Sequence, residues 1–437
     1  MTQNRINGSF RTFAVVWLGQ VVSIVGSGLT SFALGVWLFQ QTGSVTQFAL
    51  IGLFSVLPKI VLSPLAGSLV DRWNRRWLMI VTDAGAGCCT LALALLFATG
   101  NLEVWHIYLL SGLSAAFGTV QWPAYSATTT LLVAEEHLGR ANGLVQFGQA
   151  AAEILAPSLA GVLVRIIGLD GVVTIDFATF VFAVITLLLV RFPALPQPRA
   201  AEAGTPSFWQ EMTVGWKVIA SRPGLRGLLG VLTVVNFLWG MVGALIVPMV
   251  LGFASSDTLG LLISVAGTGM LAGSLVMSIW GGPKRRINGV LGFEFLSGLC
   301  YVLIGLRPSF WPTAVGAFCA HVTIAIVYGS NQAIWQSKIE PERQGRVFAA
   351  QQMISRAASP VAYLLAGPLA ERVFEPLLAS AGPMAGSLGR ILGTGPGRGI
   401  GLLFLVMGAI KMVVAVAGYA LPQVRLVEGE ARDSEMT

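Results

Sequence analysis

Apolar residues dominate this chain in long runs, and short polar segments separate the runs. Each run is about 20 residues or longer, which is enough to cross a hydrocarbon core of roughly 30 Å. In lipid, only helices and closed barrels satisfy their own backbone polar groups, and apolar runs of this length favour helices. The pattern therefore predicts an all-α integral membrane protein with twelve spans, at residues 12–38, 46–70, 77–98, 105–132, 141–166, 172–192, 225–252, 258–281, 288–306, 311–337, 346–372 and 399–421.

Basic residues are unevenly distributed among the predicted connections. If the N-terminus lies inside the cell, most Lys and Arg residues fall in cytoplasmic connections. The outer connections then contain Arg165, Arg307, Arg372, Arg390 and Arg398. The positive-inside rule accordingly predicts a multi-pass protein of the cell (plasma) membrane with both termini in the cytoplasm.

Composition supports this class. Of the 437 residues, 55% are hydrophobic and 11% are charged, whereas soluble domains contain about 25% charged residues. The net charge of +7 reflects basic cytoplasmic loops in such a protein, so we expect no nucleic-acid partner. The four cysteines lie inside apolar runs, and we therefore expect neither a disulfide framework nor a metal site.

A polar central segment divides the twelve spans into two sets of six. Residues 193–207 are rich in Pro and Ala and indicate a linker. Behind them, Phe208, Trp209, Met212, Trp216 and Ile219 recur at helical spacing, which is typical of a helix lying on the membrane surface. The predicted organisation is an N-terminal six-helix bundle at 1–192, a cytoplasmic linker with this amphipathic helix at 193–224, a C-terminal six-helix bundle at 225–421 and a cytoplasmic tail at 422–437.

An internal repeat relates the two sets of spans. The tetrapeptide GSLV occurs at 67–70 and again at 273–276. The same offset aligns Glu136, Gly139, Arg140 and Gln146 with Glu342, Gly345, Arg346 and Gln352. We infer two parallel repeats, an arrangement that places a substrate site near the membrane midplane and transports by rocking one half against the other.

The decapeptide GSLVDRWNRR, at residues 67–76, resembles the signature G-x-L-x-D-R-x-G-R-R of the major facilitator superfamily. Asn74 replaces the second glycine, and we expect it to adopt the left-handed backbone that Asn tolerates. The matching residues are Gly67, Leu69, Asp71, Arg72, Arg75 and Arg76.

The resemblance implies a cytoplasmic gate. Asp71 would dock on the N-terminal end of span 11, near Arg346, where a helix carries partial positive charge. Four basic residues would join this gate by pairing with two acidic ones. The basic residues are Arg72, Arg75, Arg76 and Arg140, and the acidic residues are Glu136 and Glu342. The alternative is a solvated loop that only anchors the topology.

Span 5 resembles a motif of the proton-driven exporters, G-x8-G-x3-G-P-x-x-G-G. Alanine replaces three of its glycines, and the stripe of small residues would still let another helix approach closely. The alternative is ordinary helix packing. The stripe consists of Gly143, Ala152, Ala156, Pro157, Ala160 and Gly161.

The overall style of spans 1 and 6 looks like that of the macrolide-efflux and enterobactin-export permeases. One pattern of many drug–proton antiporters is missing: they carry an Arg in span 4, four residues before a Gly. Tyr108 stands at that position, four residues before Gly112.

Ionisable residues inside spans are costly and usually functional. Glu153, in the centre of span 5, is the expected proton-coupling residue, and the alternative is a Glu hydrogen-bonded to a neighbouring helix. Lys59 and Arg356 are expected to assist coupling. Lys59 would pair with a carboxylate or bind an anionic group of the substrate, and the alternative is a structural buried ion pair. Arg356 would form a pair between the two halves, and the alternative is that it snorkels to the cytoplasmic side.

Other intramembrane ionisable residues are expected to be structural. Asp83, Asp176 and Glu294 lie closer to the span ends, where we expect them to tether nearby loops. Lys411 is expected to be structural, and His321 is expected to be hydrogen-bonded.

Substrate contacts are expected from spans 1, 4, 7 and 10, which line the cavity in the resembled family. Large amphipathic side chains there suit an amphiphilic cargo. The candidates are Gln20, Gln121, Tyr125, Asn236, Trp239, Asn331 and Gln332.

Together these features predict a secondary transporter that exports a small amphiphilic drug, siderophore or secreted metabolite by alternating access. No P-loop sequence is present, so we expect a proton gradient and no ATP or cofactor as the energy source. We expect small-molecule substrate and membrane lipid as partners, and a monomer. The alternatives are an importer or lipid flippase on the same fold and, less favoured for want of any catalytic motif, an intramembrane enzyme.

Overall fold

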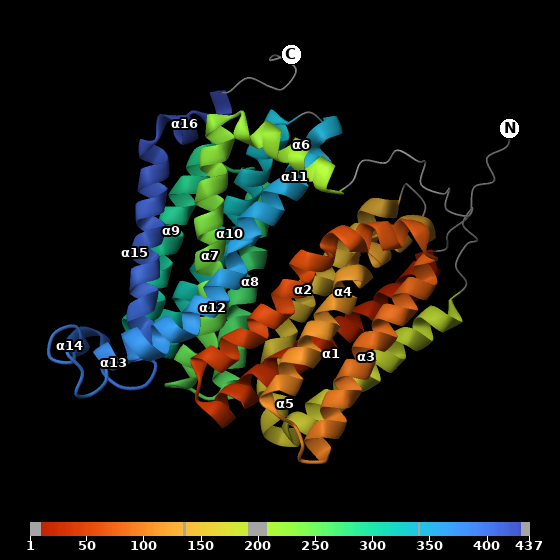
Figure 1. The fold of residues 1–437 in the computed structure, drawn as a ribbon, viewed down its shortest axis with the longest axis horizontal. Helices are drawn as coiled ribbons and strands as arrows, with labels where there is room; N and C mark the ends of the chain where they lie inside the picture. Colours follow the sequence, from red (N-terminus) through yellow and green to blue (C-terminus); the bar gives the residue numbers. More distant parts are fainter. Residues whose placement is uncertain (1–9, 134–136, 191–207, 340, 430–437) are drawn as a thin grey trace. The chain divides into compact units, whose positions relative to one another are not determined.

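The computed structural model describes residues 10–133, 137–190, 208–339 and 341–429, and these ranges contain helices and no strand (Figure 1). Nine helices within them are long and apolar enough to cross a membrane. The longer helices are α1 (Phe10–Thr42), α2 (Val45–Arg72), α3 (Arg75–Ala98), α4 (Val104–Leu132), α5 (Leu138–Leu189), α6 (Phe208–Ala220), α7 (Pro223–Leu251), α8 (Ser256–Trp280), α9 (Arg286–Leu306), α10 (Phe310–Lys338), α11 (Pro341–Arg356), α12 (Ala358–Leu369) and α15 (Arg398–Ala420). The short elements are η2 (Ala370–Phe374), α13 (Glu375–Leu377), α14 (Gly389–Leu392), α16 (Pro422–Arg425) and η3 (Val427–Gly429).

Each predicted span overlaps one of these helices. The expected break between spans 5 and 6 is reduced to one residue inside α5, because Gly168 turns the chain with a φ of 72° and a ψ of −178°. Only glycine adopts such a backbone without strain. Span 11 is divided at Ala357 between α11 and α12, since Pro360 has no amide hydrogen and its ring clashes with the carbonyl of Arg356.

The expected left-handed backbone at Asn74 is wrong. Asn74 has a φ of −64° and a ψ of 115°, and its side chain accepts hydrogen bonds from the amides of Arg76 and Trp77. Asn is a favoured N-cap because its side-chain oxygen satisfies free amides in the first helical turn. The residue therefore begins α3, which explains why a glycine is not needed at this place.

The chain forms two compact units. Unit 1 comprises Met1–Thr42 and Leu50–Thr205, and unit 2 comprises Gly43–Ala49 and Pro206–Thr437.

In unit 1, α1 packs along α5, while α3 packs against α4 and α5. Small residues make the first contact close: a Cβ added to Gly28 would lie 2.7 Å from the Cβ of Ala156. Such positions let helix backbones approach in a membrane protein, where apolar burial alone does not drive association. Phe13, Leu132 and Leu187 fill the core at one end of these helices.

In unit 2, α9 packs against α10 and α15, α10 against α8, and α7 against α12. The predicted amphipathic helix is α6, which packs on α11. Its Ile219 is buried in the core of unit 2, whereas Trp216 and Lys217 are exposed. The first turn of α2 also belongs to this unit: the carboxylate of Glu371 accepts hydrogen bonds from the backbone amide of Thr46 (3.0 Å) and the hydroxyl of Ser44 (2.8 Å).

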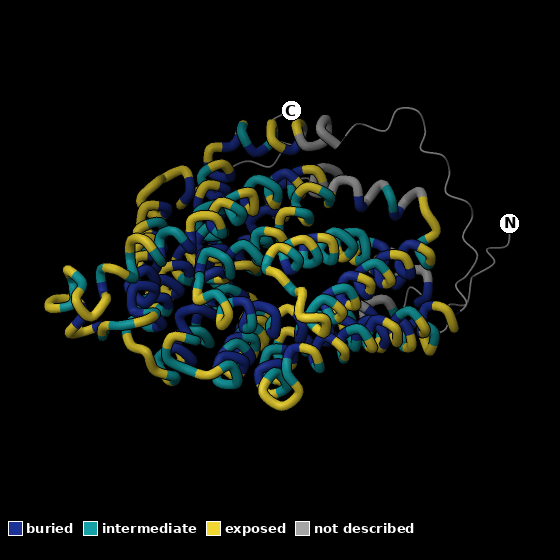
Figure 2. Tube along the Cα trace, turned by 60° about the horizontal axis from the view of Figure 1, so that its bottom comes forward, coloured by how far each residue is buried: buried dark blue, intermediate teal, exposed yellow. Residues whose placement is uncertain are grey.

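Large apolar side chains remain exposed on the outer faces of both units. Buried and exposed positions alternate along the helices (Figure 2), and Leu189, Ile279 and Trp311 are 76%, 81% and 73% exposed. Apolar exposure on this scale marks surfaces that meet lipid or a partner. Together with the length of the helices, it supports a membrane-spanning protein.

Candidate functional site

A cavity of about 410 Å³ lies within unit 1, between α1, α2, α3, α4 and α5. Its size falls in the range of small-molecule sites, roughly 300–1,000 Å³. The lining combines apolar residues such as Ile24 and Phe180 with many polar ones. The polar lining residues are Gln20, Ser23, Ser27, Thr30, Ser31, Ser55, Lys59, Thr82, Asp83, Thr90, Ser111, Ser114, Gln121, Tyr125, Gln149 and Asp176.

Asp83 of α3 forms the centre of a polar network at one end of this cavity. Its Oδ2 accepts a hydrogen bond from Gln20 Nε2 of α1, and its Oδ1 accepts one from Gln121 Nε2 of α4, both at 2.8 Å. Gln121 Nε2 also donates to Gln20 Oε1 at 2.9 Å, and the hydroxyl of Thr82 donates to Gln121 Oε1. Asp83 is only 4% exposed, so three helices meet on one buried carboxylate whose hydrogen-bond partners are neutral amides.

This placement corrects the expectation that Asp83 tethers a nearby loop. Depth along the helix was a poor guide, because the side chain points toward α1 and α4 and not toward the membrane edge. A second buried carboxylate, Asp176 of α5, lines the same cavity and accepts a hydrogen bond from Thr90 Oγ1 at 3.3 Å. Asp176 was also expected to tether a loop, and it too packs inside the helix bundle, at 1% exposure.

A sequence signal could have indicated this cavity. Gln20, Ser23, Ser27 and Thr30 follow one another at spacings of three, four and three residues, which places them on one face of α1. The partners of this face on α3, α4 and α5 are distant in sequence, and packing alone brings them together.

Only some of the site residues that were predicted in this part of the chain line the cavity. Gln20, Gln121 and Tyr125 line it, as does Lys59 of α2. Glu153 is exposed on α5 and does not line it. On the small-residue stripe, Ala152, Ala156, Ala160 and Gly161 are buried, Pro157 is half-buried and Gly143 is exposed.

Among the described residues of the expected gate, Arg76 contacts the end of a neighbouring helix. Arg76 donates hydrogen bonds from its guanidinium to the carbonyls of Leu187 (3.1 Å) and Leu188 (2.8 Å) at the C-terminal end of α5. A cation is favourable there because helix carbonyls are left unpaired. Arg140 and Arg346 are exposed and Arg75 is half-buried. Glu136 lies outside the described residues, as do the exposure of Gly67 and the side chains of Asp71, Arg72 and Glu342.

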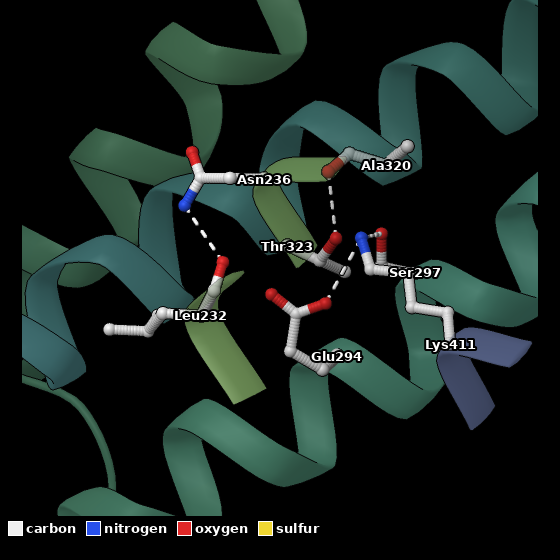
Figure 3. A network of polar contacts seen from close by, with 7 residues as sticks. All are labelled: Leu232, Asn236, Glu294, Ser297, Ala320, Thr323 and Lys411. Atoms are coloured by element: carbon white, nitrogen blue, oxygen red, sulfur yellow. Dashed lines mark hydrogen bonds and ion pairs between the residues drawn. The ribbon is translucent and has the colours of Figure 1, made fainter. Parts of the chain in front are cut away.

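Unit 2 contains a buried charge of a different kind (Figure 3). Lys411 Nζ of α15 lies 3.0 Å from Glu294 Oε2 of α9, and it donates to Ser297 Oγ at 2.7 Å. Both charged side chains are at most 3% exposed, and Lys411 also lies 4.6 Å from the ring centroid of Tyr301. Glu294 therefore neutralises Lys411 inside the bundle, which corrects the expectation that Glu294 tethers a loop.

Two of the predicted cavity residues of unit 2, Asn236 and Asn331, form hydrogen bonds within their own helices. Asn236 donates to the carbonyl of Leu232 on its own helix at 2.8 Å (Figure 3), and Asn331 accepts from Trp335 Nε1 at 3.1 Å. The Trp239 ring lies 5.4 Å from that of His321, whose Nδ1 is 2.8 Å from the carbonyl of Ala317. Gln332 is half-buried, and Arg356 is exposed.

The helices, the lipid-compatible surfaces and the internal polar cavity define a multi-pass α-helical membrane transporter for small molecules. The family model described as Major Facilitator Superfamily matches residues 16–363. The chain therefore belongs to the Major Facilitator Superfamily and is a secondary transporter, not an enzyme.

Relatives and solved structures agree with this assignment. The chain is 29% identical over 365 residues to Macrolide efflux protein A of Streptococcus pyogenes, covering 83% of this chain and 90% of the relative. It is 23% identical over 361 residues to Multidrug efflux pump Tap of Mycolicibacterium fortuitum, covering 79% and 86%. Its fold is similar to that of the nucleoside transporter NupG, with a TM-score of 0.72 and 9% identity over 93% of this chain and 99% of that one. A bacterial homologue of the human lysosomal transporter Spinster gives a TM-score of 0.68 at 15% identity, covering 98% of each chain.

Proposed function

We propose that this protein is a proton-coupled exporter of small amphiphilic molecules that works by alternating access. The similarity to a macrolide efflux protein and a multidrug efflux pump supports export and the class of cargo. The observation on which the proposal depends is the buried carboxylate of Asp83 in a cavity of small-molecule size, held by two amides.

Asp83 is the proposed proton-binding residue. Ionised, it accepts amide hydrogens from Gln20 and Gln121 with its two oxygens. Protonated, one oxygen becomes a donor, so an amide must turn or give up its bond. Because Gln20 and Gln121 are also bonded to each other, one proton rearranges polar groups from three helices.

This rearrangement provides a way to couple cargo to protons. A ligand shifts a conformational equilibrium only by its difference in affinity between the two states. A cargo that hydrogen-bonds to the amides competes with the ionised Asp83 for the same donors, so the outward release of cargo and the inward delivery of a proton can alternate on one site. The apolar lining, including Ile24 and Phe180, accommodates the hydrophobic part of the cargo, and Lys59 would attract an anionic group.

Glu153 stays the alternative coupling residue, because its intramembrane position alone suggested that role. The two carboxylates differ in surroundings, since Asp83 lines the cavity and Glu153 does not. Transport experiments separate them.

The test uses the purified full-length protein in proteoliposomes, with a radiolabelled macrolide and ethidium as probes. We expect an imposed proton gradient to drive both probes and a nucleotide to drive neither. Asp83→Asn should reduce gradient-driven flux by about 100-fold, while probe exchange at equal concentrations on both sides continues, because exchange needs no net proton movement.

The matched control is Asp170→Asn, which makes the same chemical change at an exposed position of α5 and should transport like the wild type. Wild-type gradient-driven flux in a folded Asp83→Asn protein would refute the assignment of the proton to Asp83. Movement of the probes only in the importing direction would refute export.

A further inference from the structure

The cavity in unit 1 has a second polar end, which the proposed proton coupling does not use. Thr90 lies seven residues after Asp83 on α3, a separation of about 10 Å along the helix, and Ser27 lies the same number of residues after Gln20 on α1. Both Thr90 and Ser27 line the cavity beside Asp176. The Asp176 end is therefore about two helical turns away from the Asp83 network.

Hydroxyl groups from three helices surround the carboxylate of Asp176. They belong to Ser27 and Thr30 of α1, Thr90 of α3 and Thr179 of α5. Asp176, Thr30 and Thr90 are 1%, 5% and 5% exposed, so this cluster of oxygens is shielded from bulk solvent. It includes one formal negative charge.

Within the described residues, no hydrogen bond of full geometry ends on Oδ1 of Asp176 or on Oγ1 of Thr30, although Thr30 belongs to the hydroxyls that interact with this carboxylate. Leaving buried polar atoms unpaired is costly, and such atoms in a folded protein call for an explanation. The hydroxyl of Thr179 donates its hydrogen to the backbone carbonyl of Asp176 at 2.6 Å. Its lone pairs are therefore left to accept a hydrogen bond or bind a cation.

Gly26 allows the carboxylate to approach α1. A Cβ at this position would lie 2.8 Å from Oδ1 of Asp176 and still closer to Oγ1 of Thr179. Contacts below 3 Å would force these side chains to move, so glycine at this position leaves both oxygens where they lie. The close approach brings the carboxylate of α5 next to the hydroxyls of α1, and the unpaired Oδ1 faces that helix.

We propose that Asp176, Ser27, Thr30 and Thr90 form a sodium-binding site. Hard cations prefer carboxylate and other oxygen ligands. Sodium neutralises the single carboxylate of Asp176, whereas a divalent ion would leave excess positive charge in a low-dielectric interior. A proton needs only one carboxylate oxygen, whereas sodium uses several neutral oxygens at once, such as the hydroxyls that surround Asp176.

The charged groups around the site agree with this assignment. Among the described residues, the interactions of Asp176 involve hydroxyls and no basic side chain. Asp83 and Lys59 are the other charged side chains that line the cavity, and Asp83 is engaged with its amides. A bound sodium ion would connect α1, α3 and α5 and would do so whether or not Asp83 is the proton carrier.

Thermal unfolding of the purified full-length protein in detergent tests this site without any transport measurement. Sodium chloride replaces choline chloride at constant ionic strength, and potassium chloride serves as a second reference. A ligand that binds only the folded state stabilises it, so we expect sodium to raise the Tm saturably by about 2 °C. Neither choline nor potassium should reproduce this rise.

Substitutions locate the effect. Asp176→Asn should abolish the sodium-specific rise in Tm and reduce binding of radioactive sodium at least about tenfold, and Thr30→Val should weaken binding in the same direction. Asp170→Asn, the exposed control on the same helix, should respond like the wild type. Asp83→Asn should also keep the sodium response, which separates this site from the proposed proton site.

Two results would overturn the proposal. One is a Tm that rises equally in sodium, potassium and choline. The other is a sodium-specific rise that persists in Asp176→Asn or, if that variant fails to fold, in Thr30→Val. A Tm that depends on pH through Asp176 but not on sodium would identify a proton site and would also reject the sodium assignment.

Discussion

The two units surround a buried carboxylate with different groups: a cation in unit 2 and neutral amides in unit 1. In unit 2, Glu294 is paired with Lys411 at 3.0 Å, and both side chains are enclosed. In unit 1, Asp83 is equally buried, but its hydrogen-bond partners are the neutral amides of Gln20 and Gln121, and it lines a cavity. A compensated charge stabilises one arrangement of helices. A carboxylate held only by neutral groups can change its protonation state without breaking an ion pair, and this is why we propose a structural role for Glu294 and proton coupling for Asp83.

The largest expected effect comes from breaking the pair in unit 2. Lys411→Met keeps most of the side-chain length but removes the charge, so Glu294 is left buried without its cation. Removing one partner of a buried ion pair costs about 3–5 kcal/mol. Denaturant unfolding of the purified protein should show this loss, and an unchanged unfolding free energy would mean that the pair does not hold the helices.

The next effect is expected from the amide network of unit 1. Gln121→Leu removes one of the two donors to Asp83 and leaves a buried oxygen unpaired, which costs about 1–3 kcal/mol. Gradient-driven flux in proteoliposomes should fall about tenfold, because the proton no longer rearranges the α4 side of the cavity. Flux equal to that of the wild type would separate the network from coupling.

A smaller effect is expected when both charges of unit 2 are removed together. Lys411→Met combined with Glu294→Leu replaces the pair by apolar side chains, and such replacements are often close to neutral in stability. The double variant should unfold within about 1.5 kcal/mol of the wild type and retain transport. Loss of transport in this stable double variant would give the pair a functional role and erase the contrast between the units.

The smallest effect is expected from Glu153→Gln. This residue is exposed on α5 and lies outside the cavity lining, so its charge takes no part in the proposed network around Asp83. Gradient-driven flux in proteoliposomes should therefore stay close to that of the wild type. A loss of gradient-driven flux comparable to that of Asp83→Asn would instead transfer the coupling role to Glu153.

The sequence was a good guide to the helices and a weaker guide to the site. Long apolar runs specify spans, because lipid permits few other backbone arrangements, and each predicted span overlaps a helix. The backbone conformations of Asn74 and Gly168 were harder to predict. That of Asn74 depends on which neighbouring amides need a partner, and that of Gly168 depends on how two spans join.

The site itself depended on packing between distant segments. Gln20 and Gln121 were predicted to line the cavity from their place in spans 1 and 4. The position of Asp83 in the cavity was missed because distance from a span end says nothing about which neighbouring helix the side chain faces. Position along a helix likewise did not indicate that Glu294 pairs with Lys411, because Lys411 is more than a hundred residues away in sequence.

Counting protons during cargo binding tests the central claim most directly. In a weakly buffered detergent solution, a pH indicator reports protons released or taken up when a macrolide binds to the purified protein. The account predicts that the wild type exchanges about one proton per bound macrolide and that Asp83→Asn exchanges none while still binding. Proton exchange of the same size in Asp83→Asn as in the wild type would contradict it.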